Sequence, residues 1–365
     1  MTAAAPVLEA EATIGILGGG QLARMLALAA APLGLKCHVY APDKDSCAFD
    51  VVEAHTLAAY DDENALARFA NAVDVVTYEF ENVPAKTAAY LTAHTKVLPD
   101  PHVLETTQDR LIEKNFLAGL KIATAPYAPV HSATQLADGL AKVGVPAVLK
   151  TTRLGYDGKG QAKIERAADA NEAWRSIRNV PCIIEGFIKF QREVSVIAAR
   201  GTDGTVECFD VTENEHRDHI LYISKVPAKV TPPLATEARR VATRILNAFD
   251  YVGVMGVEMF VVRKGREQHV LVNELAPRVH NSGHWTIDGA TVSQFEQHIR
   301  AVAGWPLAKP KRLGAKIEMI NLIGDEILDH THWLTAPNTA LHIYGKGKPS
   351  ARRKMGHVTR VWPGK

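Results

Sequence analysis

Thirteen consecutive residues, 273–285, combine one carboxylate, one guanidinium, two imidazoles and two amides, and they directly follow the strand-like run 269–272. A protein core cannot bury such a mixture of groups without partners. Polar residues at the end of a strand are also a common feature of enzyme active sites. The segment is therefore the first candidate for a functional site.

A second carboxylate, Glu258, lies in the preceding apolar run, and Gly265 and Arg266 between the two runs suit a hairpin loop. Folding the runs about this loop places Glu258 opposite Glu274, to within about one residue, with Cβ atoms about 5 Å apart. Two ionised carboxylates that close repel each other unless a cation or a proton lies between them. With the neighbouring Asn273 amide they are hard ligands that suit Mg²⁺ carrying nucleotide phosphates. Taken alone, the pattern fits a pair of solvated glutamates equally well.

A glycine-rich turn follows the first strand-like run and begins the first helix-like run. Gly18, Gly20 and Ala23 fit the pattern G-x-G-x-x-[GA], and Asp43 ends the second strand where a ribose-binding acid would lie. This pattern favours a dinucleotide-binding oxidoreductase. The underlying physics is less specific, because a helix N-terminus attracts any phosphate, including that of a sugar phosphate. A turn with a purely structural role would show the same glycines.

A second glycine-rich loop, 151–161, lies between two strand-like runs and has three glycines within six residues. Such a loop can move over a ligand and exclude water. Lys150 precedes the loop and Lys159 lies within it, so their ammonium groups could reach a phosphate. The flexible tip of a hairpin would have a similar composition.

Three further polar patterns are weaker on their own. Residues 77–83 end a strand at the sheet edge where ligands bind in open α/β folds, but they could equally cap the next helix. The basic residues within 346–354 suit the phosphate of a sugar phosphate or a solvated tail. The segment 185–188 offers a backbone edge for a base, with Glu193 for ribose hydroxyls and His216 nearby, although structural strands explain it better.

Strand and helix patterns place these motifs in an α/β and α+β fold. The first hundred residues alternate strand and helix signals, which is typical of a doubly wound parallel sheet. A compact α+β region and then a strand-rich region follow, so we predict domains 1–108, 109–190 and 191–365. The predicted strands are 13–17, 36–40, 74–78, 96–98, 147–151, 161–164 and 182–185, and the predicted helices are 21–33, 62–72, 84–93, 109–119, 133–142, 167–178, 233–249 and 291–303.

The composition is that of an ordinary globular enzyme. The chain of 365 residues is too long for one small core, and its 47% hydrophobic content and formal net charge of +2 give no sign of nucleic-acid or membrane binding. The four cysteines show no C-x-x-C spacing, which indicates buried thiols in a reducing compartment. The start reads as a frayed tail without a signal-peptide pattern, so we expect a cytoplasmic protein.

In chain order these motifs resemble the ATP-grasp superfamily, and most closely its carboxylating ligases of purine biosynthesis. The run 281–285 resembles these ligases specifically, rather than ATP-grasp proteins in general. The resemblance implies a three-domain ATP-grasp architecture, with an N-terminal doubly wound parallel sheet, a small α+β lid and a larger α+β domain. The motifs that carry it are 18–25, 78–83, 155–161, 273–285, 319–324 and 353–357.

The same resemblance implies the reaction and the small-molecule partners. Such a ligase converts 5-aminoimidazole ribonucleotide, bicarbonate and ATP into the N5-carboxylated ribonucleotide, ADP and phosphate through carboxyphosphate. A closed lid would protect carboxyphosphate, which hydrolyses readily in water. ATP and Mg²⁺ are the implied cofactors, neither nucleic acid nor a membrane is an expected partner, and a homodimer is implied.

By this resemblance each site residue has an expected role. Mg²⁺ would be held by Glu258 and Glu274. Bicarbonate and the carboxylated intermediate would be handled by Arg278, His280, Asn281 and Lys354. The ribonucleotide would contact Gln21, Leu22, Glu79, Tyr156, Asp157 and Ser282, with its phosphate near Lys346 and Arg353. ATP would contact Arg110, Lys150, Gly155, Tyr156, Asp157, Gly158, Lys159, Gly160, Gln161, Glu185, Gly186, Phe187, Ile188, Glu193, His216, Asn273 and Glu274.

The chain departs from the family pattern at two places. Ala23 replaces a glycine found in many members, and Ala351-Arg352 replaces a Pro-Gly pair, which leaves the phosphate ligands of the tail least secure.

Three different functions compete with a carboxylating ligase. An NAD-dependent oxidoreductase would explain the first glycine turn but neither the second glycine-rich loop nor the acidic pair. A formate-dependent glycinamide ribonucleotide transformylase would share the ATP-grasp motifs and differ in its substrates. A non-catalytic nucleotide-binding regulator would bind ATP without turnover, although the intact acidic pair argues against it.

Overall fold

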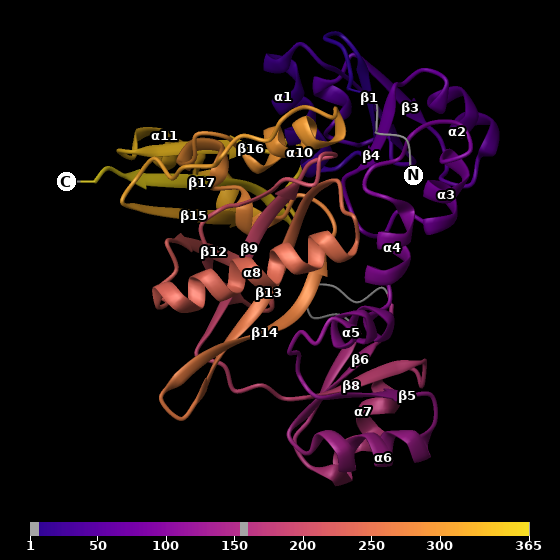
Figure 1. Ribbon diagram of the computed structural model, residues 1–365, viewed down its shortest axis with the longest axis vertical. Coiled ribbons are helices and arrows are strands. Elements are labelled where there is room, and N and C mark those ends of the chain that lie inside the picture. Colours follow the sequence, from indigo (N-terminus) through magenta and orange to yellow (C-terminus); the bar gives the residue numbers. More distant parts are fainter. Residues whose placement is uncertain (1–6, 154–159, 365) are drawn as a thin grey trace.

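Three β-sheets, each formed from a different stretch of the chain, organise the molecule in this computed structural model, which describes residues 7–153 and 160–364 (Figure 1). The first sheet is parallel, with strand order β3-β2-β1-β4. Its strands are β1 (Thr13–Leu17), β2 (Lys36–Ala41), β3 (Ala54–Leu57) and β4 (Val75–Tyr78). The helical segments of this region are α1 (Gln21–Ala30), η1 (Ala31–Leu33), η2 (Phe49–Val51), α2 (Glu63–Ala70), α3 (Ala85–Leu91) and α4 (Pro101–Thr107).

The second sheet is small and antiparallel, with order β5-β8-β6-β7, and it lies apart from the first sheet at the lower end of Figure 1. Its strands are β5 (Tyr127–Val130), β6 (Ala147–Thr151), β7 (Gln161–Ile164) and β8 (Cys182–Gly186). Helices α6 and α7 cover the sheet and share its apolar core. The helical segments here are α5 (Arg110–Gly119), α6 (Ala133–Val143), η3 (Ala167–Asp169) and α7 (Ala170–Ser176).

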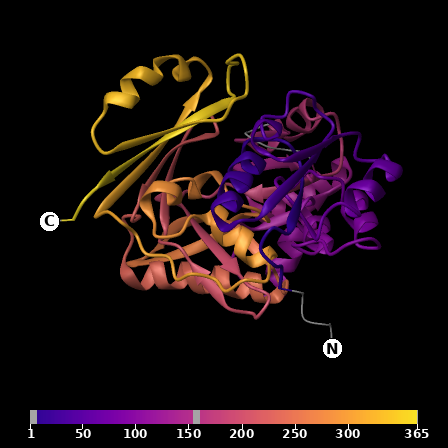
Figure 2. The ribbon, with the colours of Figure 1, turned by 90° about the horizontal axis from the view of Figure 1, so that it is seen from above.

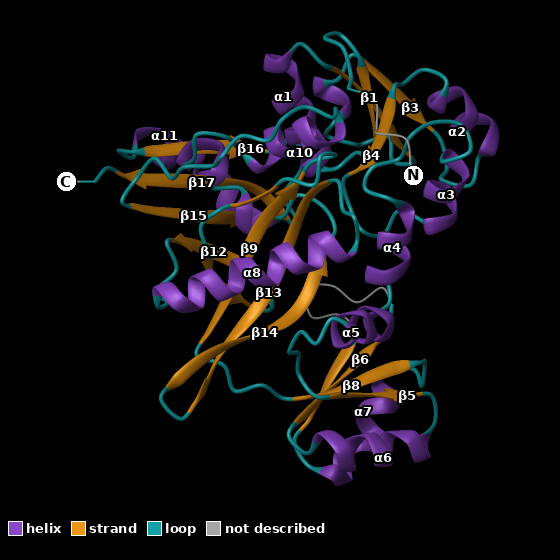
Figure 3. Cartoon of the chain, in the orientation of Figure 1, coloured by secondary structure: helices purple, strands orange, loops and turns teal. Residues whose placement is uncertain are grey.

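The third sheet is antiparallel and runs in the order β14-β13-β9-β11-β12-β15-β17-β16, with β10 paired to β9 (Figure 3). Its strands are β9 (Arg192–Arg200), β10 (Val206–Cys208), β11 (Thr212–Arg217), β12 (Ile220–Val226), β13 (Gly253–Lys264), β14 (Glu267–Ala276), β15 (Lys316–Ile323), β16 (Thr339–Ile343) and β17 (Lys354–Trp362). Its helical segments are α8 (Pro232–Ala248), η4 (Asn281–Gly283), α9 (Thr286–Gly289), α10 (Gln294–Val302), η5 (Gly324–Asp329) and α11 (His330–Thr335).

A shared apolar core joins the first and third sheets. Helix α1 packs against α10, and this core also contains residues of β1, β13 and β15 (Figure 2). A buried hydrogen bond of 2.8 Å between Thr77 Oγ1 on β4 and His298 Nε2 on α10 crosses the same junction. The carboxyl end of β4 is therefore held beside the third sheet, which brings residues 79–81 towards the polar segment after β14.

The fold class expected from sequence is confirmed, with differences at individual elements. The run 96–98 forms only a bridge between Val76 and Val97, because Pro99 has no N–H to extend a ladder. The elements that were not predicted include β3, an edge strand whose residues are mostly exposed, and the short β5 and α4. In the described part of the chain no helix is long and apolar enough to cross a membrane. The limits of the three predicted domains stay a prediction.

Candidate active site

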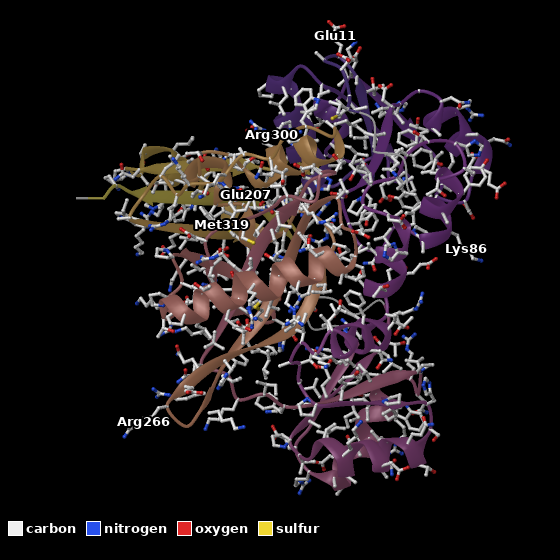
Figure 4. All side chains as sticks on the ribbon, in the orientation of Figure 1. Glu11, Lys86, Glu207, Arg266, Arg300 and Met319 are labelled. Atoms are coloured by element: carbon white, nitrogen blue, oxygen red, sulfur yellow. The ribbon has the colours of Figure 1, made fainter. Side chains whose placement is uncertain are left out.

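The hairpin of β13 and β14 brings the two expected metal-binding carboxylates together. Glu258 and Glu274 are register partners, beside a β-bulge at Glu258, so this part of the sequence prediction is confirmed. Arg266 lies at the tip of this hairpin, at the lower left of the molecule (Figure 4). Desolvation and the charge of Glu258 raise the pKa of Glu274. Burial would also raise the pKa of Glu258, but its hydrogen bond with His280 lowers it.

This pair fits a magnesium ion that also holds nucleotide phosphates. Among the described residues no group of three or more His, Cys, Asp or Glu side chains could hold a metal ion by themselves. Mg²⁺, however, is commonly bound through one or two carboxylates together with substrate phosphates and water. A cation between Glu258 and Glu274 would relieve the repulsion that contributes to the raised pKa of Glu274.

Arg278 forms an ion pair with Glu81, a residue for which no separate role was predicted. The two side chains also share a hydrogen bond, and Arg278 Nη1 donates to the Val279 carbonyl at 3.0 Å. Burial would raise the pKa of Glu81, but the guanidinium lowers it to about 2. This contact fixes Arg278 at the junction of the first and third sheets.

His280 lies between the acidic pair and the interior of the sheet. Its Nε2 is 3.0 Å from Glu258 Oε1, and its Nδ1 is 2.8 Å from Ser282 Oγ. The Ser282 hydroxyl also lies 2.7 Å from Ser195 Oγ, so both of its neighbours belong to the protein, and its expected ribonucleotide contact stays a prediction. Both amide atoms of Asn281 are buried and have no hydrogen-bond partner among the described residues, so their hydrogen-bonding capacity is unused there.

A lysine–carboxylate cluster connects the small second sheet to β14. Lys150 Nζ is 2.8 Å from Glu185 Oε2, and Lys114 Nζ is 3.7 Å from Glu185 Oε1. Burial would raise the pKa of Glu185, but the two lysines lower it. Lys114 also donates a 2.7 Å hydrogen bond to the Asn273 carbonyl. Sequence reasoning missed Lys114, because a lysine in an amphipathic helix is usually exposed, whereas this side chain is only 2% exposed.

Another carboxylate that was not predicted is Glu113, which lies next to Lys114 on α5. Its Oε2 accepts a 3.2 Å hydrogen bond from the Leu275 N–H, directly beside Glu274. Burial raises the pKa of Glu113 to about 8, against the effect of Lys114 and with a further contribution from the charge of Glu274. The site therefore contains a carboxyl group whose burial favours the protonated form.

Among the other expected ATP contacts, Glu193 and His216 lie together, whereas part of the segment 185–188 is already hydrogen-bonded within the protein. Glu193 and His216 form an ion pair; burial would lower the pKa of His216, but this pairing raises it. The expected free backbone edge at 185–188 is wrong in part, because the N–H groups of Gly186 and Phe187 donate to carbonyls of the same small sheet region.

Arg110 and Gly160, at the described end of the second glycine loop, both contact Thr151 at the end of β6. Arg110 Nη1 donates to the Thr151 carbonyl at 3.0 Å. Gly160 has φ +68°, and a Cβ there would lie 2.7 Å from Thr151 Oγ1. Gln161 begins β7, opposite Lys150. The predictions for Gly155, Tyr156, Asp157, Gly158 and Lys159 lie outside the described residues.

The first glycine turn does not offer a free helix N-terminus. Glu79 accepts hydrogen bonds from the N–H groups of Gly20 at 2.7 Å, Leu22 at 3.1 Å and Ala23 at 3.0 Å. A Cβ on Gly18 would lie 2.4 Å from Glu79 Cγ, which explains the glycine there. The expectation that this turn attracts a phosphate is therefore wrong, because a carboxylate of the chain already occupies the position.

The basic tail approaches Glu79 from the third sheet. Lys346 Nζ donates to the Lys354 carbonyl at 3.0 Å, and Arg353 Nη1 donates to the Lys346 carbonyl at 3.3 Å. Burial lowers the pKa of Lys346 to about 8, partly offset by the nearby Cys47 and Glu79. Gln21 is partly exposed at the start of α1, so a ligand between this helix and the tail could reach it.

Comparisons with known proteins agree with this arrangement. The chain matches the family models of a ribonucleotide synthetase preATP-grasp domain over residues 11–108, an ATP-grasp domain over 115–295 and a phosphoribosylaminoimidazole carboxylase C-terminal domain over 318–363. It is 49% identical over 358 residues to N5-carboxyaminoimidazole ribonucleotide synthase of Brucella melitensis, covering 98% of both chains. It is 40% identical to the synthase of Bacillus subtilis, covering 97% of this chain and 92% of that protein.

Solved structures are similar over nearly the whole chain. A crystal structure of an N5-carboxyaminoimidazole ribonucleotide synthetase with ADP is 40% identical, has a TM-score of 0.93 and covers 99% of this chain and 94% of its own. The synthase of Aspergillus clavatus with ADP and 5-aminoimidazole ribonucleotide is 29% identical, with a TM-score of 0.87 and coverage of 97% and 94%. The chain belongs to the N5-carboxyaminoimidazole ribonucleotide synthase family of ATP-grasp ligases.

Proposed function

We propose that this chain carboxylates the exocyclic amine of 5-aminoimidazole ribonucleotide with bicarbonate and ATP, giving N5-carboxyaminoimidazole ribonucleotide, ADP and phosphate in purine biosynthesis. The observation that carries the proposal is that one hairpin and the segment after it bring together two chemistries. Glu258 and Glu274 form an acidic pair for the nucleotide, and Arg278 and His280 follow within the same segment.

The first half-reaction is phosphoryl transfer from ATP to bicarbonate. A bicarbonate oxygen attacks the γ-phosphorus, the bond to ADP breaks, and carboxyphosphate forms. Lys150 and Arg110 hold the nucleotide, with its base and ribose near 185–188, Glu193 and His216. When bound to Glu258 and Glu274, Mg²⁺ neutralises charge on the phosphate oxygens, which is the main requirement of phosphoryl transfer.

The second half-reaction is carboxylation of the amine. The amine nitrogen attacks the carboxyl carbon of carboxyphosphate, or CO₂ released from it, inorganic phosphate leaves, and the amine proton passes to that phosphate. Arg278, held by Glu81, offers its remaining guanidinium N–H groups to the carboxylate oxygens. Both atoms of the Asn281 amide lack partners among the described residues and would bind the same group. His280, Lys354 and Ser282 complete this side of the site.

The ribonucleotide lies between the first sheet and the basic tail. Lys346 and Arg353 bind its phosphate, and Gln21, Leu22 and Glu79 border its ring and ribose. The fixed position of Glu79 over the start of α1 supports this placement, because its carboxylate is preorganised by three N–H groups. Tyr156 and Asp157, which lie outside the described residues, are assigned to the same ligand by family resemblance alone.

Three further features belong to the proposal. A homodimer follows from family resemblance and would sediment at twice the mass of one chain. The cytoplasm is the proposed compartment, which the four free cysteines support. Mg²⁺ is the proposed metal because the acidic pair provides hard oxygen ligands, while no complete protein cage occurs among the described residues.

The decisive assay measures ADP release by the purified protein with ATP, Mg²⁺, bicarbonate and 5-aminoimidazole ribonucleotide, omitting each in turn. We expect ADP release to require the ribonucleotide and bicarbonate, and formate not to replace bicarbonate. Activity with formate and glycinamide ribonucleotide would identify the transformylase instead. ATP binding without turnover would identify a regulator, and hydride transfer with NAD would contradict the proposal.

A further inference from the structure

A row of buried polar side chains extends from Glu258 across four strands of the third sheet. Glu258 on β13 is the register partner of Ser195 on β9, and Asn214 on β11 is the partner of Ser224 on β12. Ser195 is also paired with Thr212, two residues before Asn214. Because side chains alternate between faces with a period of two, all of these residues lie on one face of the sheet.

Segment 280–283 covers this face and completes the row. Ser282 Oγ lies 2.7 Å from Ser195 Oγ and 2.8 Å from His280 Nδ1. The row is closed to solvent, since Ser195, Ser224 and Ser282 are 0% exposed and Asn214 is 7% exposed. Apolar residues of similar shape would pack here at little cost in stability. Stability alone therefore does not explain why these buried positions hold hydrogen-bonded polar side chains.

The direction of the hydrogen bonds is set at both ends of the row. At one end, Ser224 Oγ donates to Asn214 Oδ1 at 2.9 Å, and Asn214 Nδ2 donates to Ser195 Oγ at 3.0 Å. Because Ser195 Oγ accepts from Asn214, its own hydrogen can point to Ser282 Oγ, and the Ser282 hydroxyl can then donate to His280 Nδ1. The Ser282 backbone N–H also points at the same nitrogen, at 3.4 Å, so Nδ1 is an acceptor.

At the other end, His280 Nε2 faces the Glu258 carboxylate at 3.0 Å. A carboxylate only accepts, so this nitrogen must carry the proton. Both ends therefore require the same arrangement of the ring, with a donor at Nε2 and an acceptor at Nδ1. If the Asn214 amide were turned over, every hydroxyl in the row would donate in the opposite direction. The Ser282 oxygen would then face the lone pair of His280 Nδ1, or a hydrogen on Nδ1 would leave Nε2 as an acceptor facing the Glu258 carboxylate.

We propose that Asn214, Ser195 and Ser282 are positioning residues that set the tautomer of His280 and thereby direct its Nε2–H at one oxygen of Glu258. This holds the Glu258 carboxylate in a fixed orientation towards Glu274 and the nucleotide. The role for His280 rests on the proposed function, whereas the tautomer itself follows from the contacts of the protein alone.

The tautomer is tested directly by ¹⁵N NMR of histidine-labelled, metal-free and nucleotide-free protein, with the His280 signals assigned from their absence in His280→Gln. We expect hydrogen on Nε2 and none on Nδ1. Asn214→Asp has nearly the same shape but only accepts, so it reverses the row and should place a proton on Nδ1. Hydrogen on Nδ1 in the wild-type protein, or an unchanged His280 signal in Asn214→Asp, would overturn the proposal.

Kinetics test the consequence for catalysis. Ser195→Ala breaks the row, and we expect about a tenfold lower kcat for ribonucleotide-dependent ADP release with KM for ATP changed by less than about twofold. Ser195→Thr keeps the hydroxyl and should restore kcat. Thr87→Val removes a buried hydroxyl that donates to the Tyr60 carbonyl in the first domain, and serves as the matched control.

The NMR and kinetic measurements can fail independently of the proposed function. If the enzyme does not act on the ribonucleotide at all, the NMR signals still report the tautomer. If Asn214→Asp does not fold, the comparison of Ser195→Ala with Ser195→Thr still tests the positioning role. Wild-type kcat in Ser195→Ala, or equally low kcat in Ser195→Ala and Ser195→Thr, would contradict the positioning role.

Discussion

Four glutamates around one site differ in charge because their neighbours differ. Arg278 overcomes the burial of Glu81 and lowers its pKa to about 2, and His280 overcomes the burial of Glu258 and lowers its pKa as well. Burial raises the pKa of Glu113 to about 8, and burial together with the charge of Glu258 raises that of Glu274. At the residue scale, the site therefore has fixed anions beside Arg278 and His280 and a carboxylate at Glu274 that gains from a bound cation.

Glu274→Gln tests that carboxylate. The change removes one ligand charge while keeping the shape of the side chain, so we expect ribonucleotide-dependent ADP release to fall by about a hundredfold or more, because a metal ion contributes several kcal/mol. The thermal unfolding midpoint should not fall, since the repulsion with Glu258 is removed. Glu267→Gln, at the exposed start of β14, is the matched control. Wild-type turnover in Glu274→Gln would contradict the metal assignment.

At the scale of elements, helix α5 connects the small second sheet to the hairpin that carries the acidic pair. Lys114 contacts Glu185 on β8 and the carbonyl of Asn273 on β14, and the next residue back, Glu113, accepts from Leu275. One turn of α5 thus fixes β14 on both sides of Glu274. The helix would transmit a displacement of the second sheet to the nucleotide site.

Lys114→Met tests this connection. The substitution preserves most of the apolar stem but leaves the Asn273 carbonyl and one oxygen of Glu185 without a cation, so we expect a loss of about 3 kcal/mol in unfolding free energy. KM for ATP should rise more than KM for the ribonucleotide, because Asn273 and Glu185 belong to the nucleotide side. Denaturant unfolding and steady-state kinetics measure the two effects. Lys121→Met, an exposed lysine just after α5, should change neither.

At the scale of the whole molecule, the candidate site lies where the first and third sheets meet. Their common apolar core holds α1 against α10, and the Thr77–His298 hydrogen bond crosses it. His298 Nδ1 also accepts a hydrogen bond from the Val254 N–H at 3.1 Å. Both ring nitrogens of His298 therefore form hydrogen bonds in the neutral form. Burial lowers the pKa of His298 to about 4.

The stability of this junction should depend on pH. Below the ordinary histidine pKa of about 6.5 the unfolded chain binds a proton that the folded His298 excludes. As pH decreases from 6.5 towards 4, His298 should therefore lower the free energy of unfolding by up to about 1.4 kcal/mol per pH unit. His298→Gln keeps a hydrogen-bonding group that does not titrate. A pH dependence of denaturant unfolding equal to wild type in this variant would contradict the prediction.

The elements and the acidic pair could be predicted because their signals are local. Hairpin register depends on a short loop and the alternation of side chains, so Glu258 and Glu274 were placed opposite each other from the sequence. The predicted strands 13–17, 147–151 and 161–164 match the observed ones for the same reason. The exposed edge strand β3 lacked such a signal.

The sequence by itself determined the family, the fold class and the segments that carry the chemistry, because these depend on motifs within short stretches. Only the tertiary structure decided which groups from distant segments meet. Arg278 and Glu81 are 197 residues apart, and the occupation of the α1 N-terminus by Glu79 spans 59 residues to Gly20. The row that ends at His280 needs four strands in register. Such contacts follow from packing between distant segments, for which no local pattern in the chain provides a signal.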